Sequence, residues 1–264
     1  MFSWLRRLRP APRIPDEAWQ ATLARYRFLA ERPPADIARL RELAAEFLRD
    51  KRFHGAHGFV ISDEVALAIA AQAVLPVLHL KGGLNWYDDF VGVIVHPSEA
   101  VAQRTTVDAT GVVHEYEEVV AGEAMDRGPV MLSWQDVLAG GATRDEGYNV
   151  VIHEFAHKID MRGGAADGCP PLPRGFRGTS NARDARAAWL AVLQPAYDSF
   201  REKTILAERF GGEEPWLDAY GAQSAGEFFA VACEAYFVNR ERLRSDFAEL
   251  VLLFDAFFTP PGQR

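Results

Sequence analysis

Cysteine is scarce in this sequence, and that scarcity excludes some kinds of site. Cys169 and Cys233 are the only two cysteines among 264 residues. They form no Cys-x-x-Cys pair, so a cysteine-based zinc knuckle is excluded. One disulfide between them is conceivable, but two reduced thiols are the ordinary expectation for a cytosolic protein.

Long apolar runs are also lacking. No stretch approaches the 18 apolar residues of a membrane-spanning helix, and the nearest, 65–80, contains Pro76 and His79. The first residues, MFSWLRRLRPAPRIP, are basic, but arginines and prolines interrupt any apolar segment, so they do not form a signal peptide. We therefore expect residues 1–20 to be a flexible tail, and the protein to be cytoplasmic with no membrane partner.

Positive charge is in the minority. The chain has 29 Lys and Arg against 37 Asp and Glu, a formal net charge of -8, which argues against direct nucleic-acid binding. Its 48% apolar and 25% charged residues are typical of a soluble globular protein. The length suits one large domain, which we expect over 21–264, with a helical and sheet part at 21–140 and a helical part at 141–264.

Apolar periodicity predicts helices in both halves of the chain and short strands between them. The expected helices are 37–53, 65–74 with Asp63 as cap, 143–162 opened by the capping box Thr143-x-x-Glu146, 182–210, 224–239, and a short one ending near Phe258. The expected strands are 77–80, 91–96, 112–120 and 130–134. A Gly/Pro-rich segment at 163–181 reads as an ordered loop or a lid. This order predicts an α+β fold.

The string NVVIHEFAHKID at 149–160 contains the pattern His-Glu-x-x-His. Residues four apart share one face of a helix, so His153 and His157 can direct their imidazoles at one point. Neutral imidazole suits zinc (Zn2+), and catalytic zinc takes three protein ligands with one open position for water. Glu154 lies one residue round the helix, where it can take a proton from that water. The pattern therefore predicts a catalytic zinc site.

The third ligand stays open on spacing alone. The extended pattern with a further histidine six residues on fails, because position 163 is glycine. Glu227 and Glu234 lie seven apart on one face of an apolar helix, where a buried carboxylate needs a metal or a hydrogen-bond partner. Ser224-x-x-Glu227 also fits a capping box. Glu234 and Asp160 are candidates to accept a hydrogen bond from a ligand imidazole.

Four strings closely resemble the bacterial Mlc titration factor A peptidases: HEFAHKIDMR, DAY followed by GEFFAVACEAYF, GFVISDEVALAIAAQAVLPVLHL, and GPVMLSWQDV. The resemblance runs from about Phe47 to beyond Phe237. It implies a zincin-like fold with a gluzincin-like zinc site, similar to the catalytic domain of anthrax lethal factor. In such a fold a small mixed sheet accompanies an active-site helix that carries the histidines and a second helix that carries a glutamate ligand.

The resemblance also implies roles for single residues. His153 and His157 match the histidine ligands, Glu227 matches the glutamate ligand, Glu154 matches the catalytic glutamate, and Tyr220 matches a tyrosine that stabilises the oxyanion. A phenol donor near the metal is suited to this role, because negative charge builds on the carbonyl oxygen in the transition state.

For function, the resemblance implies aminopeptidase-like hydrolysis of peptides, and binding of the glucose-responsive repressor Mlc, which is thereby drawn off DNA. The alternative is a regulatory binding protein that sequesters a transcription factor, with peptidase activity secondary. The intact His-Glu-x-x-His pattern favours an active peptidase, since a protein that only bound a partner would not need Glu154. We also expect 128–134 to form a sheet edge on which an extended substrate lies antiparallel, unless that strand is internal.

Overall fold

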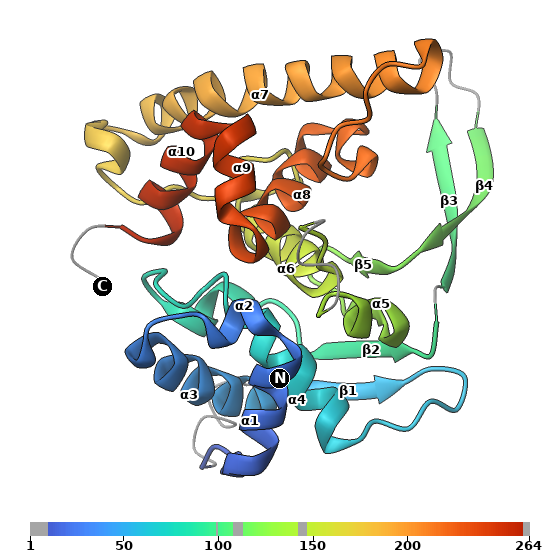
Figure 1. Cartoon of the computed structure of the whole chain (residues 1–264), viewed down its shortest axis with the longest axis vertical. Coiled ribbons are helices and arrows are strands. Elements are labelled where there is room, and N and C mark those ends of the chain that lie inside the picture. Colours follow the sequence, from blue (N-terminus) through green and yellow to red (C-terminus); the bar gives the residue numbers. More distant parts are fainter. Residues whose placement is uncertain (1–9, 99, 108–112, 142–146, 261–264) are drawn as a thin grey trace.

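The computed structural model describes residues 10–98, 100–107, 113–141 and 147–260 (Figure 1). One group of helices lies in the lower half of Figure 1 and another in the upper half, with the sheet beside them. The elements in chain order are α1 (Asp16–Arg25), α2 (Arg27–Ala30), α3 (Pro34–Asp50), β1 (Arg52–Gly55), α4 (Asp63–Ala73), β2 (Gly92–His96), β3 (Ala100–Val107), β4 (Val113–Val120), β5 (Gly122–Ala124), β6 (Val130–Ser133), α5 (Trp134–Ala139), α6 (Val150–Asp160), α7 (Ala182–Phe210), α8 (Ala225–Val238), α9 (Arg240–Asp246) and α10 (Ala248–Phe258). Short 3-10 turns lie at Gly83–Tyr87, Met161–Gly163, Phe176–Gly178 and Ala219–Ala222.

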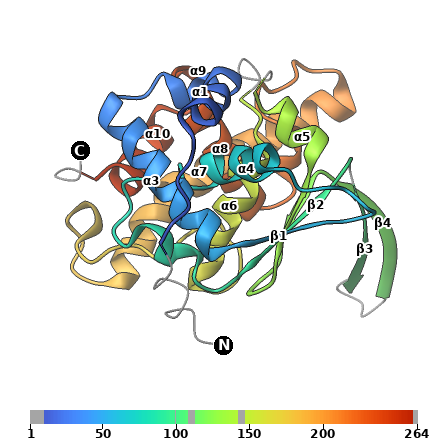
Figure 2. The same ribbon diagram turned by 90° about the horizontal axis from the view of Figure 1, so that it is seen from below.

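A small mixed sheet has the strand order β1-β2-β6-β5. Strands β1, β2 and β6 are parallel, and β5 is antiparallel to β6 with Gly122 opposite Leu132. Strands β3 and β4 form a separate antiparallel ribbon, seen beside the sheet in Figure 2. This mixed α+β architecture confirms the predicted fold class. The prediction that 128–134 lies at the sheet edge was wrong, because β6 pairs on both sides and β5 is the edge strand.

Helix α6 lies at the centre of the molecule, packed between α8 on one side and the sheet and α4 on the other (Figure 1). All 11 of its residues are buried, so its polar groups must find partners inside the protein. It begins at Val150, where the Asn149 side chain accepts a hydrogen bond from the Ile152 N–H. The start expected at residue 143 was therefore wrong, and the predicted capping box itself lies outside the described residues.

Helices α7 and α8 carry the C-terminal half of the fold. Helix α7 has the predicted bounds, and α8 begins after Ser224, whose hydroxyl accepts the Glu227 N–H at 3.1 Å. The Gly/Pro-rich segment at 163–181 packs against the start of α7. Its Gly168 carbonyl accepts the Trp189 indole N–H at 2.7 Å, and Phe176 packs on the same indole ring. This segment is thus an ordered loop.

Several predicted boundaries differ from the structure. Ser62, not Asp63, caps α4, since the Ser62 hydroxyl accepts the Val65 N–H at 3.2 Å. The apolar run 77–80 forms successive tight turns rather than a strand. Short apolar runs do not distinguish a buried strand from buried turns, and Pro76 supplies no N–H for a ladder. Helix α1 begins at Asp16, inside the range assigned to the tail.

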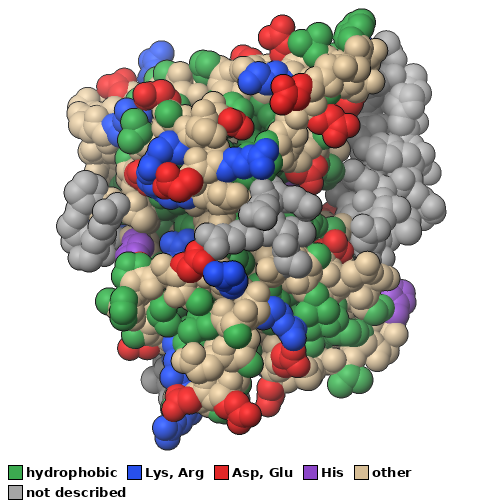
Figure 3. All heavy atoms as spheres, in the orientation of Figure 1, with side chains coloured by type: hydrophobic (Ala, Val, Ile, Leu, Met, Phe, Trp, Pro, Cys, Tyr) green, Lys and Arg blue, Asp and Glu red, His purple; other side chains and the backbone are tan. Residues whose placement is uncertain are grey.

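The buried apolar side chains of both halves form one contiguous core. Cys169 and Cys233 are free thiols within it, as expected. In the described part of the chain, no helix is both long and apolar enough to cross a bilayer. On the face shown in Figure 3, basic and acidic side chains of the described residues are interspersed.

Candidate metal centre

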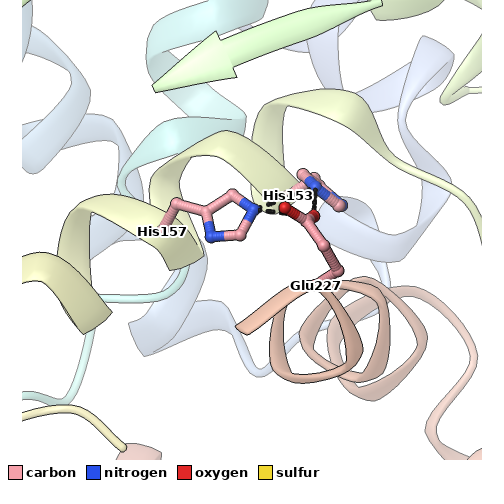
Figure 4. Close-up of side chains that lie close together, drawn as sticks. All are labelled: His153, His157 and Glu227. Carbon is pink, nitrogen blue, oxygen red and sulfur yellow. Dashed lines mark hydrogen bonds and ion pairs between the residues drawn. The ribbon is translucent and has the colours of Figure 1, made fainter. Parts of the chain in front are cut away.

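Three side chains from two helices meet at one point between α6 and α8 (Figure 4). The Nε2 atoms of His153 and His157 lie 3.1 Å apart. Oε2 of Glu227 lies 3.1 Å from the first nitrogen and 3.0 Å from the second. The histidines are one helical turn apart on α6, and Glu227 reaches them from the first turn of α8. Because the Ser224 cap uses only the backbone N–H of Glu227, the carboxylate remains available to this cluster.

These three atoms fit a metal ion better than a hydrogen-bond cluster. Zinc–nitrogen bonds of about 2.0–2.1 Å in tetrahedral geometry place neighbouring ligand atoms about 3.3 Å apart, close to the separations found here. Two imidazole nitrogens and one carboxylate oxygen are also a donor set that zinc prefers. Among the described residues, this is the one group of three histidine, cysteine or carboxylate side chains with such spacing. The residues therefore fit the predicted metal.

Glu234, two turns further along α8, lies behind His153. Its Oε1 lies 2.7 Å from His153 Nδ1, and its Oε2 accepts the backbone N–H of Asn149 at the start of α6. With Nδ1 protonated and bonded to Glu234, His153 presents the unprotonated Nε2 toward the cluster. This bond holds the His153 ring in the orientation seen in Figure 4, and a role of Glu234 behind a ligand imidazole stays a prediction.

Glu154 is a buried carboxyl group beside the cluster, with only 4% of its surface exposed. Its Oε2 has no hydrogen-bond partner, and burial raises its pKa to about 7. A carboxyl group with a pKa near neutrality takes and returns protons efficiently at working pH. Gly122 of β5 lies directly against it: a Cβ at Gly122 would stand 2.5 Å from Glu154 Oε1.

Tyr220 approaches the cluster from the turn that precedes α8. Its ring centroid lies 6.0 Å from that of His153. The Asp218 side chain accepts the backbone N–H of Tyr220 at 2.9 Å and so shapes this turn. The structure therefore brings Tyr220 to the same cavity as the three clustered side chains.

Asp160 does not take the position expected from the sequence. Its Oδ2 accepts the backbone N–H of Gly168 at 2.7 Å, and no hydrogen bond between described residues joins it to either imidazole. Burial raises its pKa to about 7. Through Gly168, the Asp160 carboxylate holds the loop that follows α6.

A cavity of 380 Å³ opens over the cluster. Its lining includes strand β5 and the residue before it, and it contains no lysine or arginine among the described residues. The lining residues are Ala121, Gly122, Glu123, Ala124, Tyr148, Val150, His153, Glu154, His157, Met161, Ala166, Asp218, Tyr220, Glu227 and Glu234. The contribution of β5 was not predicted from the sequence, because a three-residue strand is too short to show alternation. Gly122 between two strand-like runs was the available signal.

An α+β fold whose central helix carries His-Glu-x-x-His, with a glutamate from a second helix at the same point, defines a zincin-like metallopeptidase. A family model described as glucose-regulated metallo-peptidase M90 matches residues 2–259, nearly the whole chain. The chain belongs to this family.

Curated relatives agree with this assignment. The chain is 33% identical over 221 residues to Mlc titration factor A of Yersinia pestis (strain Pestoides F), covering 83% of this chain and 76% of that protein. Mlc titration factor A of Yersinia pseudotuberculosis serotype O:1b (strain IP 31758) matches with the same identity and coverage. The resemblance noted in the sequence is thus confirmed as membership of the Mlc titration factor A family.

Proposed function

We propose that this protein is a zinc-dependent peptidase of the aminopeptidase type, with His153, His157 and Glu227 as the metal ligands. The observation that carries the proposal is the convergence of these three donor atoms beside the buried, unpartnered carboxyl oxygen of Glu154. Burying a carboxyl oxygen without a hydrogen-bond partner costs free energy, so side chains that served only stability would not include Glu154 beside Glu227.

The bound zinc would supply Lewis acidity, lowering the pKa of a water molecule and polarising the scissile carbonyl. Glu154 accepts the proton of that water at its carboxylate and later returns it to the leaving amine. The Tyr220 hydroxyl donates a hydrogen bond to the carbonyl oxygen as negative charge develops there. Glu234 keeps His153 in the tautomer that presents Nε2 to the metal.

Strand β5 supports a peptide as the substrate. The Ala121 carbonyl accepts the Ser133 N–H of β6, and the Met125 N–H donates to Pro129 just before β6. The backbone groups of Gly122 and Ala124 therefore point away from β6, and both residues line the cavity. An extended peptide can pair with such an edge. Glu123 and Asp218 also line the cavity and favour a substrate with a cationic group, such as the α-ammonium of a free N-terminus.

The test is the Glu154→Gln variant, assayed beside the wild-type protein for zinc content and for hydrolysis of aminoacyl chromogenic substrates. Glutamine has nearly the same shape but accepts no proton, so we expect one zinc per chain and a loss of activity of roughly a hundredfold or more. N-terminally blocked peptides serve as the second substrate set, since an aminopeptidase leaves them intact. Near-normal turnover by Glu154→Gln would contradict the assigned base.

A second role is binding of an Mlc-type transcriptional repressor in the cytoplasm. It is supported by the name of the relatives, Mlc titration factor A, and by the description of the family as glucose-regulated. Glu154→Gln separates the two roles, because it removes the chemistry and leaves the surface unchanged. If the variant still binds such a repressor and releases it from DNA, the regulatory role does not need peptidase activity.

A further inference from the structure

Lys158 follows the metal-binding pattern directly and is wholly buried on α6. Its Nζ donates hydrogen bonds to the backbone carbonyls of Met125 and Gly128, the second at 2.9 Å. Both carbonyls belong to the turn that joins β5 to β6. A buried ammonium group is costly unless it is hydrogen-bonded, so these two bonds hold the turn firmly against the helix.

Gly122 makes a second contact between the same two elements, at the other end of β5. A Cβ here would meet the Glu154 side chain at 2.5 Å from Oε1 and 2.7 Å from Cγ. Gly122 is not among the glycines with positive φ, so close approach, not backbone conformation, requires a glycine. Glu154 and Lys158 are four residues apart and share the face of α6 that β5 covers.

We propose that Lys158 and Gly122 are positioning residues that fix the edge strand β5 at two points along α6. The strand then presents its outward backbone groups to a peptide at a set distance from Glu154. This inference rests on the proposed peptidase function and adds the device that places the substrate. Neither residue touches the metal ligands in this role, so zinc binding does not depend on it.

Lys51 provides a matched control for burial of a lysine. Its Nζ donates to the carbonyls of Tyr87 and Phe90 and lies 3.7 Å from the centroid of the Phe90 ring. Lys158 Nζ lies 4.6 Å from the centroid of the same ring. Both lysines therefore bond two backbone carbonyls beside one aromatic ring, but only Lys158 bonds the β5–β6 turn.

The experiment compares zinc-loaded wild-type protein, Lys158→Met and Lys51→Met on two substrates with the same first residue, an aminoacyl p-nitroanilide and an unblocked hexapeptide. Each variant removes two hydrogen bonds from a lysine to backbone carbonyls, so both lose stability. For Lys158→Met we expect KM for the hexapeptide to rise about tenfold more than KM for the anilide, the equivalent of one or two misplaced backbone hydrogen bonds. Lys51→Met should leave the ratio of the two KM values unchanged.

A change of the KM ratio by the same factor in both lysine variants would overturn the proposal, as would an unchanged ratio in Lys158→Met. Gly122→Ala tests the other point of contact and keeps the proposal testable if Lys158→Met does not fold. Its added methyl group displaces β5 from Glu154, so we expect kcat to fall at least tenfold with zinc content unchanged. A wild-type kcat in this variant also counts against the proposal. Wild-type protein that binds zinc and cleaves neither substrate would refute the proposed function itself.

Discussion

Glu227 and Glu234 lie on one face of α8, but the structure gives them different neighbours. Glu227 reaches both Nε2 atoms of the histidine pair, whereas Glu234 bonds the far nitrogen of His153 and the backbone of Asn149. In the proposed metal site, a substitution of Glu227 removes an anionic donor from the metal. A substitution of Glu234 changes only the group that bonds a ligand histidine from behind. Substitution of each glutamate should separate these roles.

For Glu227→Gln we expect a sharp loss of zinc affinity, because a neutral amide oxygen replaces an anionic donor on a dication. For Glu234→Gln the expected loss is smaller, on the order of 10–100-fold in affinity or activity. Zinc affinity is measured for both variants by competition with a chelator, alongside thermal melts. If Glu227→Gln holds zinc normally while Glu234→Gln loses it, the assignment of the third ligand is wrong.

Lys51 makes stability depend on pH. Burial lowers its pKa from 10.5 to about 7 in the folded protein. Between pH 7 and pH 10.5 the unfolded chain therefore binds more protons at this residue than the folded one, so its contribution to the free energy of unfolding rises with pH. Below about pH 7 both states are protonated, and the cost of burying the charge is fully present.

We expect Lys51→Met to lose this pH dependence. Between pH 7 and pH 10, wild-type protein should gain on the order of 3 kcal/mol from this residue relative to the variant. The measurement is urea unfolding of both proteins at pH 7, 8.5 and 10, because the difference between them cancels other groups that titrate in this range. Parallel curves for the two proteins would show that Lys51 keeps an ordinary pKa.

At the scale of elements, Asn149 joins three parts of the fold at the start of α6. Its side-chain oxygen caps the helix through Ile152, its amide nitrogen donates to the buried Gln72 of α4 at 2.7 Å, and its backbone N–H bonds Glu234. Asn149→Ala removes the first two bonds and keeps the third. We expect a loss of about 1–3 kcal/mol in the free energy of unfolding, with zinc content unchanged.

Ser62→Ala is the matched control for Asn149→Ala, because Ser62 caps α4 from a more exposed position and its side chain makes no second hydrogen bond among the described residues. It should cost about 1 kcal/mol or less. Chemical denaturation of both variants checks this order. An equal loss in the two variants would show that the bond between Asn149 and Gln72 contributes no stability.

The elements that periodicity predicts best are the long helices of the C-terminal half. Helix 182–210 and the helix after Ser224 follow from long apolar stripes and clear caps, and the histidine pair follows from spacing on one helix. The third side chain of the cluster could not be predicted from spacing. Glu227 and Glu234 are seven residues apart on one helix face, and only tertiary packing distinguishes them. The resemblance, not the spacing, indicated Glu227.

Sequence patterns predicted the sheet less well, for a physical reason. Strand β5 has three residues and β1 has four, so neither shows enough alternation to be recognised. Strand order depends on pairing between distant segments, so the sequence could not distinguish an edge from an internal position for 128–134. Asp160 was placed correctly on α6, but its partner Gly168 lies in a loop whose path no local pattern specifies.

At the scale of the whole molecule, the clustered side chains join parts of the chain that are far apart in sequence. His153 and His157 come from α6, Glu227 comes from α8, and the loop and long helix α7 lie between them. The unfolded chain does not hold these groups together, so under the proposed function zinc would bind it much more weakly than it binds the folded protein. Zinc binding should therefore stabilise the fold by mass action.

Added zinc should therefore raise the melting temperature of the protein. With free zinc at about a hundred times its dissociation constant, the folded state gains about 2.7 kcal/mol, which should raise Tm by roughly 5–10 °C for a domain of this size. The histidine nitrogens must be unprotonated to bind, so the rise in Tm should shrink as the pH falls from 7.5 to 5.5. Thermal melts of chelator-treated protein with and without added zinc measure this rise in Tm.

His157→Ala is the control, since it removes one of the three donors and leaves the surface almost unchanged. A rise in Tm of the same size in His157→Ala would place the stabilising zinc elsewhere on the chain, and the cluster between α6 and α8 would lose its assignment as the metal site.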